Sequence, residues 1–454
     1  MTQFLSLPIE ILHRICYYAD LSSRKGLRLM NRRLGDVAAR WVFHTISVSP
    51  LEASCDRLQN ILQRPDVASY VMKLYLVTFD LEEDGNCVDT ESQDCHEETE
   101  VPRRFWDLFD QIKDFPRLQS VALCFHWEHS NGEWVTPQPT ETFRSPVMER
   151  VFAALAAMPQ KVNELAIQDL HNANETDPTV VADIKQVLGG IQSLRLNIVN
   201  ELWDDPPSDT YKKKEAQAFP RQLPGFWLRP AMSNLRHLTL YSDLRWGFYP
   251  ILDFTGIHFP QLETLALGHY AFADNSQLQW ILSHAATLTE LYLDDCSILY
   301  AMAREWDETE TLLPHDRFTY RNEEHRELWA LYDGRWADYF RAFKHELPRL
   351  QHFRYGRLMN IRNSERTPFE KETDMEVALH EESYQAFFEE RESNQYASEA
   401  NCEEWEVEQD GIPPWPPASQ WEEDRQALGE LCAKLGQTLL KDSKQKDSEE
   451  KDGE

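Results

Sequence analysis

A short apolar phrase of the form L-x-x-L-x-L recurs along the chain from residue 70 onward. Its last two apolar positions alternate with other residues, as a strand with one buried face requires. Helical patterns separate several copies, and Gly189-Gly190 would end one of these helices. Strand and helix in one repeating order predict an α/β fold with parallel strands. The phrases begin at Val71, Leu118, Val162, Ile191, Leu235, Leu262, Leu288 and Leu350.

The spacing of the phrases favours a leucine-rich-repeat-like solenoid over residues 49–360. Spacings of 26–29 residues suit such repeats, and the longer spacings require insertions or a degenerate repeat. We expect an acidic insert at 80–100 and a helical insert at 297–347, the second with an aromatic-rich stripe that runs from Leu328 to Leu347. The alternative is an ordinary α/β sheet whose strands resemble one another by accident.

Residues 6–43 carry the pattern of three short helices. Asp20 and Asn31 mark the breaks between them, because their side chains favour caps and turns. Three short helices bury little apolar surface by themselves, so we expect this unit to pack on a partner or on the following domain. Its apolar positions at helical spacing are Ile11, Leu12, Ile15, Tyr18, Leu27, Met30, Leu34, Val37, Ala38 and Trp41.

The net charge of −31 is concentrated outside the predicted core. The insert 80–100 contributes −10, and residues 364–454, with 26 acidic and 9 basic residues, contribute −17, which leaves −4 for the rest. A nucleic-acid partner is not expected, because phosphate binding needs clustered Lys and Arg. Residues 361–454 are predicted to form an acidic, partly disordered tail with a helix near 419–440.

The chain lacks the usual signals of membrane insertion, secretion and disulfide bonding. It has no run of 18 apolar residues, so we expect no membrane-spanning helix. Pro8 and Glu10 interrupt the apolar N-terminus, and no secretory signal is expected. None of the eight cysteines forms a C-x-x-C pair, which favours reduced thiols. A cytoplasmic or nuclear location is the resulting expectation.

Motifs for catalysis or cofactor binding are missing from the sequence. It contains no G-x-G-x-x-G, P-loop, H-E-x-x-H or G-x-S-x-G, so we expect no enzyme activity, cofactor or metal. Asp80-x-Glu82-x-Asp84-Gly85 followed by Glu91 is similar to an EF-hand calcium loop. An EF-hand needs helices on both sides, whereas residues 71–79 have a strand pattern. A solvated acidic loop is therefore the favoured interpretation.

The first 48 residues resemble an F-box. Leu7-Pro8-x-Glu10-Ile11-Leu12-x-x-Ile15-x-x-Tyr18, followed by Asp20-Leu21, is similar to the opening of that motif, and residues 27–34 are similar to its second half. Residues 43–48 resemble the strand that commonly follows in F-box proteins of filamentous fungi. The usual pattern of the second half is replaced here by Asn31-Arg32-Arg33-Leu34. A plain helical cap on the solenoid is the alternative interpretation.

The resemblance implies a function in ubiquitin ligation. An F-box protein binds the Skp-type adaptor of an SCF-type cullin–RING E3 ubiquitin ligase and recruits a protein substrate for ubiquitination. The alternatives are an F-box scaffold that works outside ubiquitination and an enzyme with an unrecognised site. Carried over to this chain, the adaptor-binding residues would be Leu7, Pro8, Ile11, Leu12, Ile15, Leu27 and Met30.

The repeat phrases also predict where a protein target would bind. Residues that alternate with the buried leucines must point to the opposite face of the sheet, which a solenoid presents as a concave surface. We expect Tyr241 and Tyr292 to be exposed there and to matter most for binding, because exposed tyrosines supply a large contact area at low entropy cost. The alternative is that the tail or an inserted helix covers this face. The predicted target-binding residues are His237, Tyr241, His269, Tyr292 and Asp294.

Overall fold

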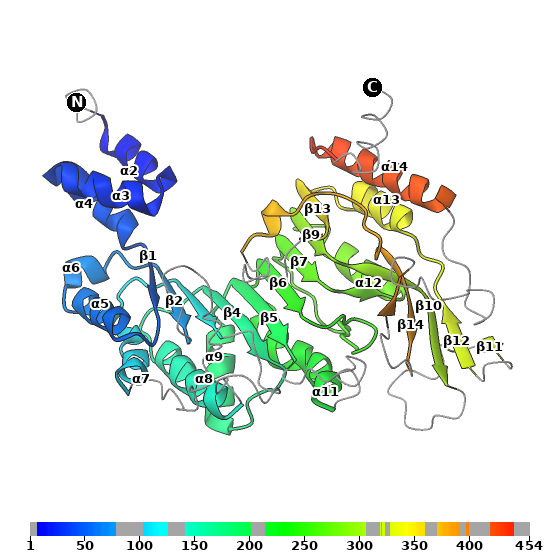
Figure 1. The fold of residues 1–454 in the computed structure, drawn as a ribbon, viewed down its shortest axis with the longest axis horizontal. Coiled ribbons are helices and arrows are strands. Elements are labelled where there is room, and N and C mark those ends of the chain that lie inside the picture. The colour runs from blue at the N-terminus through cyan, green and yellow to red at the C-terminus, as the bar shows by residue number, and fades with distance from the viewer. Residues whose placement is uncertain are drawn as a thin grey trace, which may run out of the picture. The chain divides into compact units, whose positions relative to one another are not determined.

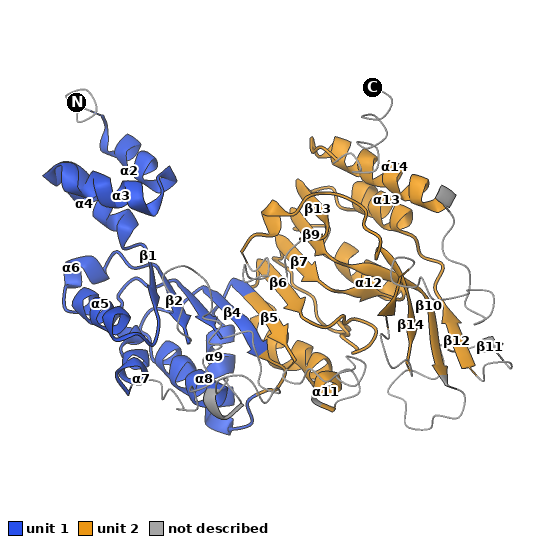
Figure 2. Cartoon of the chain, viewed as in Figure 1, with its two compact units in different colours: residues 1–170, 175–194 blue, residues 171–174, 195–454 orange. Residues whose placement is uncertain are grey.

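The computed structural model describes residues 7–78, 103–125, 141–200, 214–305, 318, 320–322, 327–358, 370–389, 396–398 and 418–439 (Figure 1). The chain forms two compact units (Figure 2). Unit 1 comprises residues 1–170 and 175–194, and unit 2 comprises residues 171–174 and 195–454. The acidic insert at 80–100, with its calcium-loop-like motif, lies outside the described residues.

Among the described residues, three helices open unit 1, as the sequence predicts. They are α2 (Ile9–Tyr18), α3 (Leu21–Met30) and α4 (Arg32–Val42). Asp20 caps α3 by accepting a hydrogen bond from the Ser23 N–H at 2.8 Å, and Asn31 caps α4 by accepting one from the Leu34 N–H at 3.0 Å. The small core between the helices consists of Leu12, Cys16, Leu34, Val37 and Ala38, with Leu7, Leu27 and Trp41 packed against it.

Among the described residues, nine strands form one sheet in the order β1-β2-β3-β4-β5-β6-β7-β9-β13. Strand pairs on both sides of β5 are parallel, so the predicted α/β class with parallel strands is confirmed. The strands are β1 (Thr45–Val48), β2 (Lys73–Val77), β3 (Ser120–Cys124), β4 (Glu164–His171), β5 (Ser193–Val199), β6 (His237–Ser242), β7 (Thr264–Gly268), β9 (Glu290–Asp294) and β13 (His352–Gly356).

Helices lie between these strands in the chain, as the repeating order requires. None of the helices in the described ranges is long and apolar enough to cross a bilayer. The longer ones are α5 (Glu52–Leu62), α7 (Arg103–Phe109), α8 (Glu141–Ala156), α9 (Pro178–Leu188), α11 (Lys214–Leu223) and α12 (Asn275–Leu282). Short turns are α6 (Pro65–Ala68), η1 (Ile112–Asp114), η2 (Pro224–Leu228) and η3 (Arg229–Ala231).

The recurring phrases occupy equivalent places in the sheet. In unit 2 the second apolar position of each phrase pairs directly with that of the next, so that Leu238, Leu265, Leu291 and Phe353 form one fully buried row across four strands. Side chains at matching positions therefore stack, as repeated units require. That the repeats are of the leucine-rich class stays a prediction.

Backbone conformation repeats with the phrases as well. Asp169, His269 and Asp295 have positive φ angles of 56°, 53° and 47°. Each residue stands two positions after the last apolar residue of its phrase. A left-handed conformation is costly for a residue with a Cβ. His269 and Asp295 directly follow β7 and β9, so the chain leaves these two strands in the same conformation, whereas Asp169 lies within β4.

The predicted helical insert at 297–347 is wrong over most of its length. Residues 297–305 and 327–331 form strands of a second sheet, and the helix begins only after Gly334. A Cβ on Gly334 would lie 2.4 Å from the Tyr332 ring, so glycine permits this tight turn between strand and helix. The elements are β10 (Ser297–Glu305), β11 (Tyr320–Asn322), β12 (Glu327–Leu331) and α13 (Trp336–Glu346).

The acidic tail supplies ordered elements to unit 2. Strand β14 (Tyr384–Phe388) pairs in parallel with β10, and β15 (Tyr396–Ala397) pairs with β14. The short strand β8 (Ala271–Phe272) pairs with β10 as well. The predicted tail helix is confirmed as α14 (Ala418–Lys434), and it packs on α13, where Asp424 accepts a 2.8 Å hydrogen bond from the Ala337 N–H.

Candidate functional site

Exposed apolar side chains are concentrated on α2 and α3. Of the nine large apolar residues that are exposed within the described part of the chain, seven lie on these two helices. Tyr18 is 73% exposed and Leu29 is 86% exposed. A contiguous exposed apolar patch is a candidate interaction surface, whereas single exposed apolar residues are ordinary. We call this group the apolar set: Ile9, Ile11, Tyr17, Tyr18, Leu21, Leu29 and Met30.

The predicted adaptor-binding residues divide between core and surface. Pro8, Ile11 and Met30 are exposed, and Ile15 is half-buried. Leu12 is fully buried in the core of the three helices, so the expectation that it offers a surface contact is wrong. Leu7 and Leu27 pack against this core and hold the helices together.

Members of the apolar set that sequence reasoning missed lie off the stripe that faces the core. Tyr17 follows the buried Cys16 by one position on α2, and Leu29 follows the core-packed Leu27 by two positions on α3, so neither shares a helix face with that neighbour. Apolar residues on both faces of a short helix were the available signal. That signal indicates apolar surface beyond the face that the helical core buries, and both residues are exposed in the structure.

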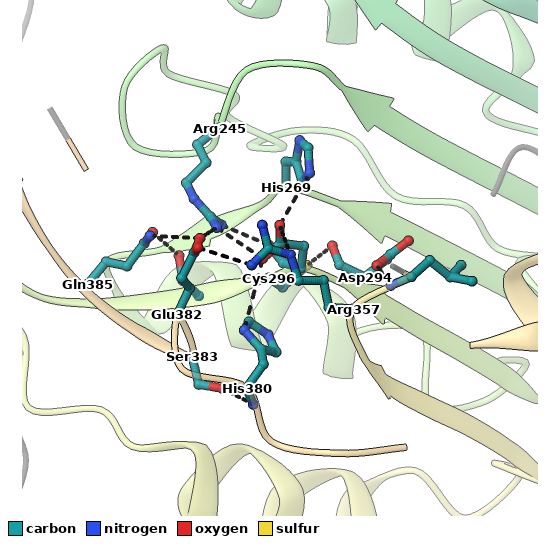
Figure 3. A network of polar contacts seen from close by, with 12 residues as sticks. Arg245, His269, Asp294, Cys296, Arg357, His380, Glu382, Ser383 and Gln385 are labelled. Carbon is teal, nitrogen blue, oxygen red and sulfur yellow. Dashed lines mark hydrogen bonds and ion pairs between the residues drawn. The ribbon is translucent and has the colours of Figure 1, made fainter. Parts of the chain in front are cut away.

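A second candidate site lies in unit 2, where the predicted target-binding residue His269 belongs to a cluster of charged side chains around Asp295. The Asp295 side chain is 3% exposed and pairs with several charged groups at the carboxyl ends of β7, β9 and β13. Figure 3 shows this polar cluster, in which Arg245, His269 and Arg357 are labelled. The Arg245 Nη2 atom lies 3.0 Å from Asp295 Oδ1 and 2.5 Å from Glu382 Oε2. Arg357 contacts the same two carboxylates, at 3.4 Å from Asp295 and 3.0 Å from Glu382.

Histidines complete the polar cluster. His269 Nε2 lies 3.4 Å from Asp295 Oδ2, and His380 Nδ1 lies 4.0 Å from Asp295 Oδ1. Burial raises the pKa of Asp295, but the nearby Arg245 charge and the hydrogen bond from His269 outweigh it and hold that pKa far below the usual range. Burial lowers the pKa of His380 to about 4, so this ring is neutral at pH 7.

Nucleophilic chemistry is not supported in this cluster. Ser383 Oγ accepts hydrogen bonds from the His380 backbone N–H at 3.1 Å and from the Tyr355 hydroxyl at 2.8 Å. Neither ring nitrogen of His380 has a hydrogen-bond partner among the described residues, so the ring is not positioned as a base for Ser383. Burial raises the pKa of Cys296 well above that of a free thiol, which keeps the sulfur protonated. The geometry is that of an ion-pair network that fastens the tail segment to the strand ends. No group of metal-ligating side chains occurs among the residues that the structure covers.

A tail segment covers the face that the sequence predicts to be exposed. We call residues 372–378 the strap; it begins with the short turn η5 (Glu372–Asp374). Met375 packs against Tyr241, Ala266 and Tyr292, while Leu358 lies beside them. Tyr241 is 5% exposed and Tyr292 is 2% exposed, so the expectation of exposed tyrosines is wrong. The alternative, that the tail covers this face, is confirmed.

The other predicted target-binding residues are not free on the surface either. His237 is half-buried, and its Nε2 atom lies 3.1 Å from Thr239 Oγ1. His269 belongs to the polar cluster. Asp294 is buried and accepts a 3.0 Å hydrogen bond from the Leu358 N–H. The structure thus brings these five residues to one region of unit 2 but places the strap and its neighbours over them.

Both ends of the strap are attached to the sheet. At its start, Glu372 forms an ion pair with Arg195 and accepts a 2.9 Å hydrogen bond from Thr239 Oγ1. At its end, the Ala378 N–H donates to the Tyr355 carbonyl at 2.9 Å. A Cβ on Gly356 would lie 2.2 Å from the Glu376 carbonyl oxygen, so this glycine allows the backbone of the strap to approach β13.

Gly268 tests the packing under the strap. A Cβ at this position would lie 2.1 Å from Tyr241 Cδ1, and the Tyr241 ring is enclosed by Met375 and Ala266. We expect Gly268→Ala to lower the free energy of unfolding by about 1–3 kcal/mol, measured by urea denaturation. Gly225→Ala is the control, because its added Cβ would meet no side chain or backbone atom within 4 Å apart from those of its immediate chain neighbours and its own helix backbone. Equal stability of the two variants would contradict the packing described for Tyr241.

Comparison with models of known protein families finds no family that matches this chain. Comparison with curated proteins finds no match either.

Proposed function

We propose that this protein is an F-box-type adaptor. Its helices α2–α4 bind a Skp-type adaptor, and unit 2 holds a protein substrate for an SCF-type cullin–RING E3 ubiquitin ligase. The observation that carries the proposal is the apolar set, since seven of the nine exposed large apolar residues in the described ranges belong to α2 and α3. The residue pattern of 7–34, with its resemblance to an F-box, names the class of partner.

The physical reason is an incomplete core. Three helices with only five fully buried apolar residues leave much apolar area in water. Covering such area releases about 25 cal/mol per Å², which gives the apolar set a strong tendency to be buried by a partner. Helix-rich surfaces of this kind bind partners through a few apolar anchors.

The mechanism of the proposed function is proximity. A protein held by unit 2 and a ligase held by α2–α4 would share one chain, which raises the effective concentration of target lysines near the ubiquitin-conjugating enzyme. A scaffold outside ubiquitination would bind the Skp-type adaptor equally well. Recruitment of the cullin, and accumulation of a target after loss of this protein, separate the two functions.

Adaptor binding is tested by changing exposed residues that the helical core does not use. We expect Ile11→Glu plus Met30→Glu to weaken binding of a purified Skp-type adaptor by more than tenfold, because each change places a charge in an apolar contact. Titration calorimetry measures the affinity, and a melting curve shows that the fold is retained. Leu331→Glu, an equally apolar and 61% exposed position in unit 2, is the control. Undiminished binding by the folded double variant would refute the proposal.

A further inference from the structure

The strap occupies the sheet face in the manner of a bound peptide. Residues whose side chains are buried, Glu372, Met375 and Val377, are separated by residues whose side chains are exposed, Thr373, Asp374 and Glu376. Of the first group, Glu372 and Met375 contact side chains of the sheet. Buried and exposed side chains alternate in this way wherever a segment lies on a surface with its other side in solvent, as a peptide in a groove does.

The anchors of the strap meet complementary chemistry. The Glu372 carboxylate lies between the Arg195 guanidinium and the Thr239 hydroxyl, which themselves lie 3.3 Å apart. Three residues later, the Met375 side chain enters an apolar cluster with Tyr241 and Tyr292. A charged anchor in a polar cradle and an unbranched apolar anchor between aromatic rings define two separate recognition points.

The backbone of the strap adds little to this attachment. Within the described residues, a backbone hydrogen bond to the sheet joins the Ala378 N–H to the Tyr355 carbonyl on β13, at the very end of the strap. The polar cluster fastens the chain just beyond the strap, through Glu382 to Arg245 and Arg357. The ion pairs of Glu382 therefore hold the chain on the C-terminal side of the strap. If the side chains of the strap were released from the sheet, we expect strand β14 to stay in place.

We propose that the strap is an internal ligand, and that the face beneath it is a peptide-binding groove for a partner segment with an acidic residue followed three positions later by methionine or a similar unbranched apolar residue. This inference rests on the proposed function, because the partner is the protein substrate. A tethered segment competes at an effective concentration in the millimolar range for short linkers, so the strap sets a threshold that a substrate must exceed.

The test supplies the strap sequence as a separate peptide. A fluorescent peptide of residues 371–379 is titrated, with anisotropy detection, against the full-length protein and against Glu372→Ala plus Met375→Ala. The double variant lacks both anchors but keeps the groove. We expect it to bind the peptide at least tenfold more tightly than the unchanged protein does, because the internal competitor has been weakened.

Matched peptides identify the contacts. A peptide with alanine at the positions of Glu372 and Met375 should not bind, whereas one with alanine at the exposed positions Asp374 and Glu376 should bind like the parent. Both peptides lose two side chains, and the first loses one negative charge and the second loses two. If charge alone drove binding, the second peptide would therefore be the weaker one.

Two results would overturn the inference. One is failure of the parent peptide to bind the folded double variant. The other is loss of a cooperative melting transition in that variant, because a segment required for folding is not a displaceable ligand. Adaptor binding is measured on the same preparations and should be unchanged. A failure there would count against the role of α2–α4, and a failure of peptide binding alone would count against the groove.

Discussion

Replacing Arg245 with methionine is expected to lower the free energy of unfolding by about 3–5 kcal/mol. Arg245 is 10% exposed, and its guanidinium contacts the Asp295 carboxylate, the Asp295 backbone carbonyl at 2.8 Å and Glu382. Removal leaves two acidic groups close together, one of them almost fully buried, without their main positive partner. An uncompensated buried charge costs far more than the pair itself contributes to stability.

Arg357→Met is the matched control for this change. Arg357 contacts the same two carboxylates, but its side chain is 45% exposed, so water replaces it at small cost. We expect a loss below about 1 kcal/mol. Urea denaturation of unchanged protein and both variants, followed by circular dichroism, provides the comparison. Equal losses in the two variants would show that burial does not distinguish the two arginines and would contradict the electrostatic account of the cluster.

The repeating part of the fold was predictable from the sequence for a physical reason. Leu238, Leu265 and Leu291 stand at the same place in successive phrases, and direct pairing of these residues follows from parallel strands in register. Asp20 and Asn31 likewise predict helix boundaries correctly, because each cap is a local hydrogen bond. Local periodicity and local hydrogen bonds are properties that one segment carries by itself.

The tail was harder to predict, because its structure depends on distant partners. Tyr384–Phe388 becomes a strand by pairing with β10, and no local pattern shows that neighbour. The alternation of Met375, Val377 and Leu379 within an acidic stretch was the one available sign that the strap has a buried side. That sign would have corrected the expectation that Tyr241 and Tyr292 are exposed.

The adaptor-binding and target-binding predictions also differ in how far local sequence patterns could predict them. Sequence patterns place Ile11 and Met30 on helices, and both are exposed as a docking role requires. The strand pattern correctly turns Tyr241 and Tyr292 away from the leucine rows, toward the other face. What covers that face lies more than 80 residues further along the chain, beyond the reach of any local rule.

Asp294 gives unit 2 a pH dependence that one substitution should remove. Burial raises the pKa of Asp294 to about 6, with a further contribution from Asp295, against the lowering effects of the Leu358 N–H and His269. The folded chain therefore holds this proton more tightly than the unfolded chain. The resulting stability is fully present below about pH 4 and is lost as pH rises through about 6.

Asp294→Asn should abolish this loss, because its amide oxygen can still accept the 3.0 Å hydrogen bond from Leu358 while carrying no charge. A shift of about two units corresponds to roughly 3 kcal/mol, so between pH 4 and pH 7 the variant should gain stability relative to the unchanged protein by about that amount. Urea unfolding at intervals of half a pH unit measures the difference. Asp374→Asn, which removes an exposed carboxylate of the strap, is the control and should show no such trend. The result that contradicts this prediction is a constant difference in the free energy of unfolding between Asp294→Asn and the unchanged protein from pH 4 to pH 7. It would show that the buried carboxyl group titrates alike in the folded and unfolded chains.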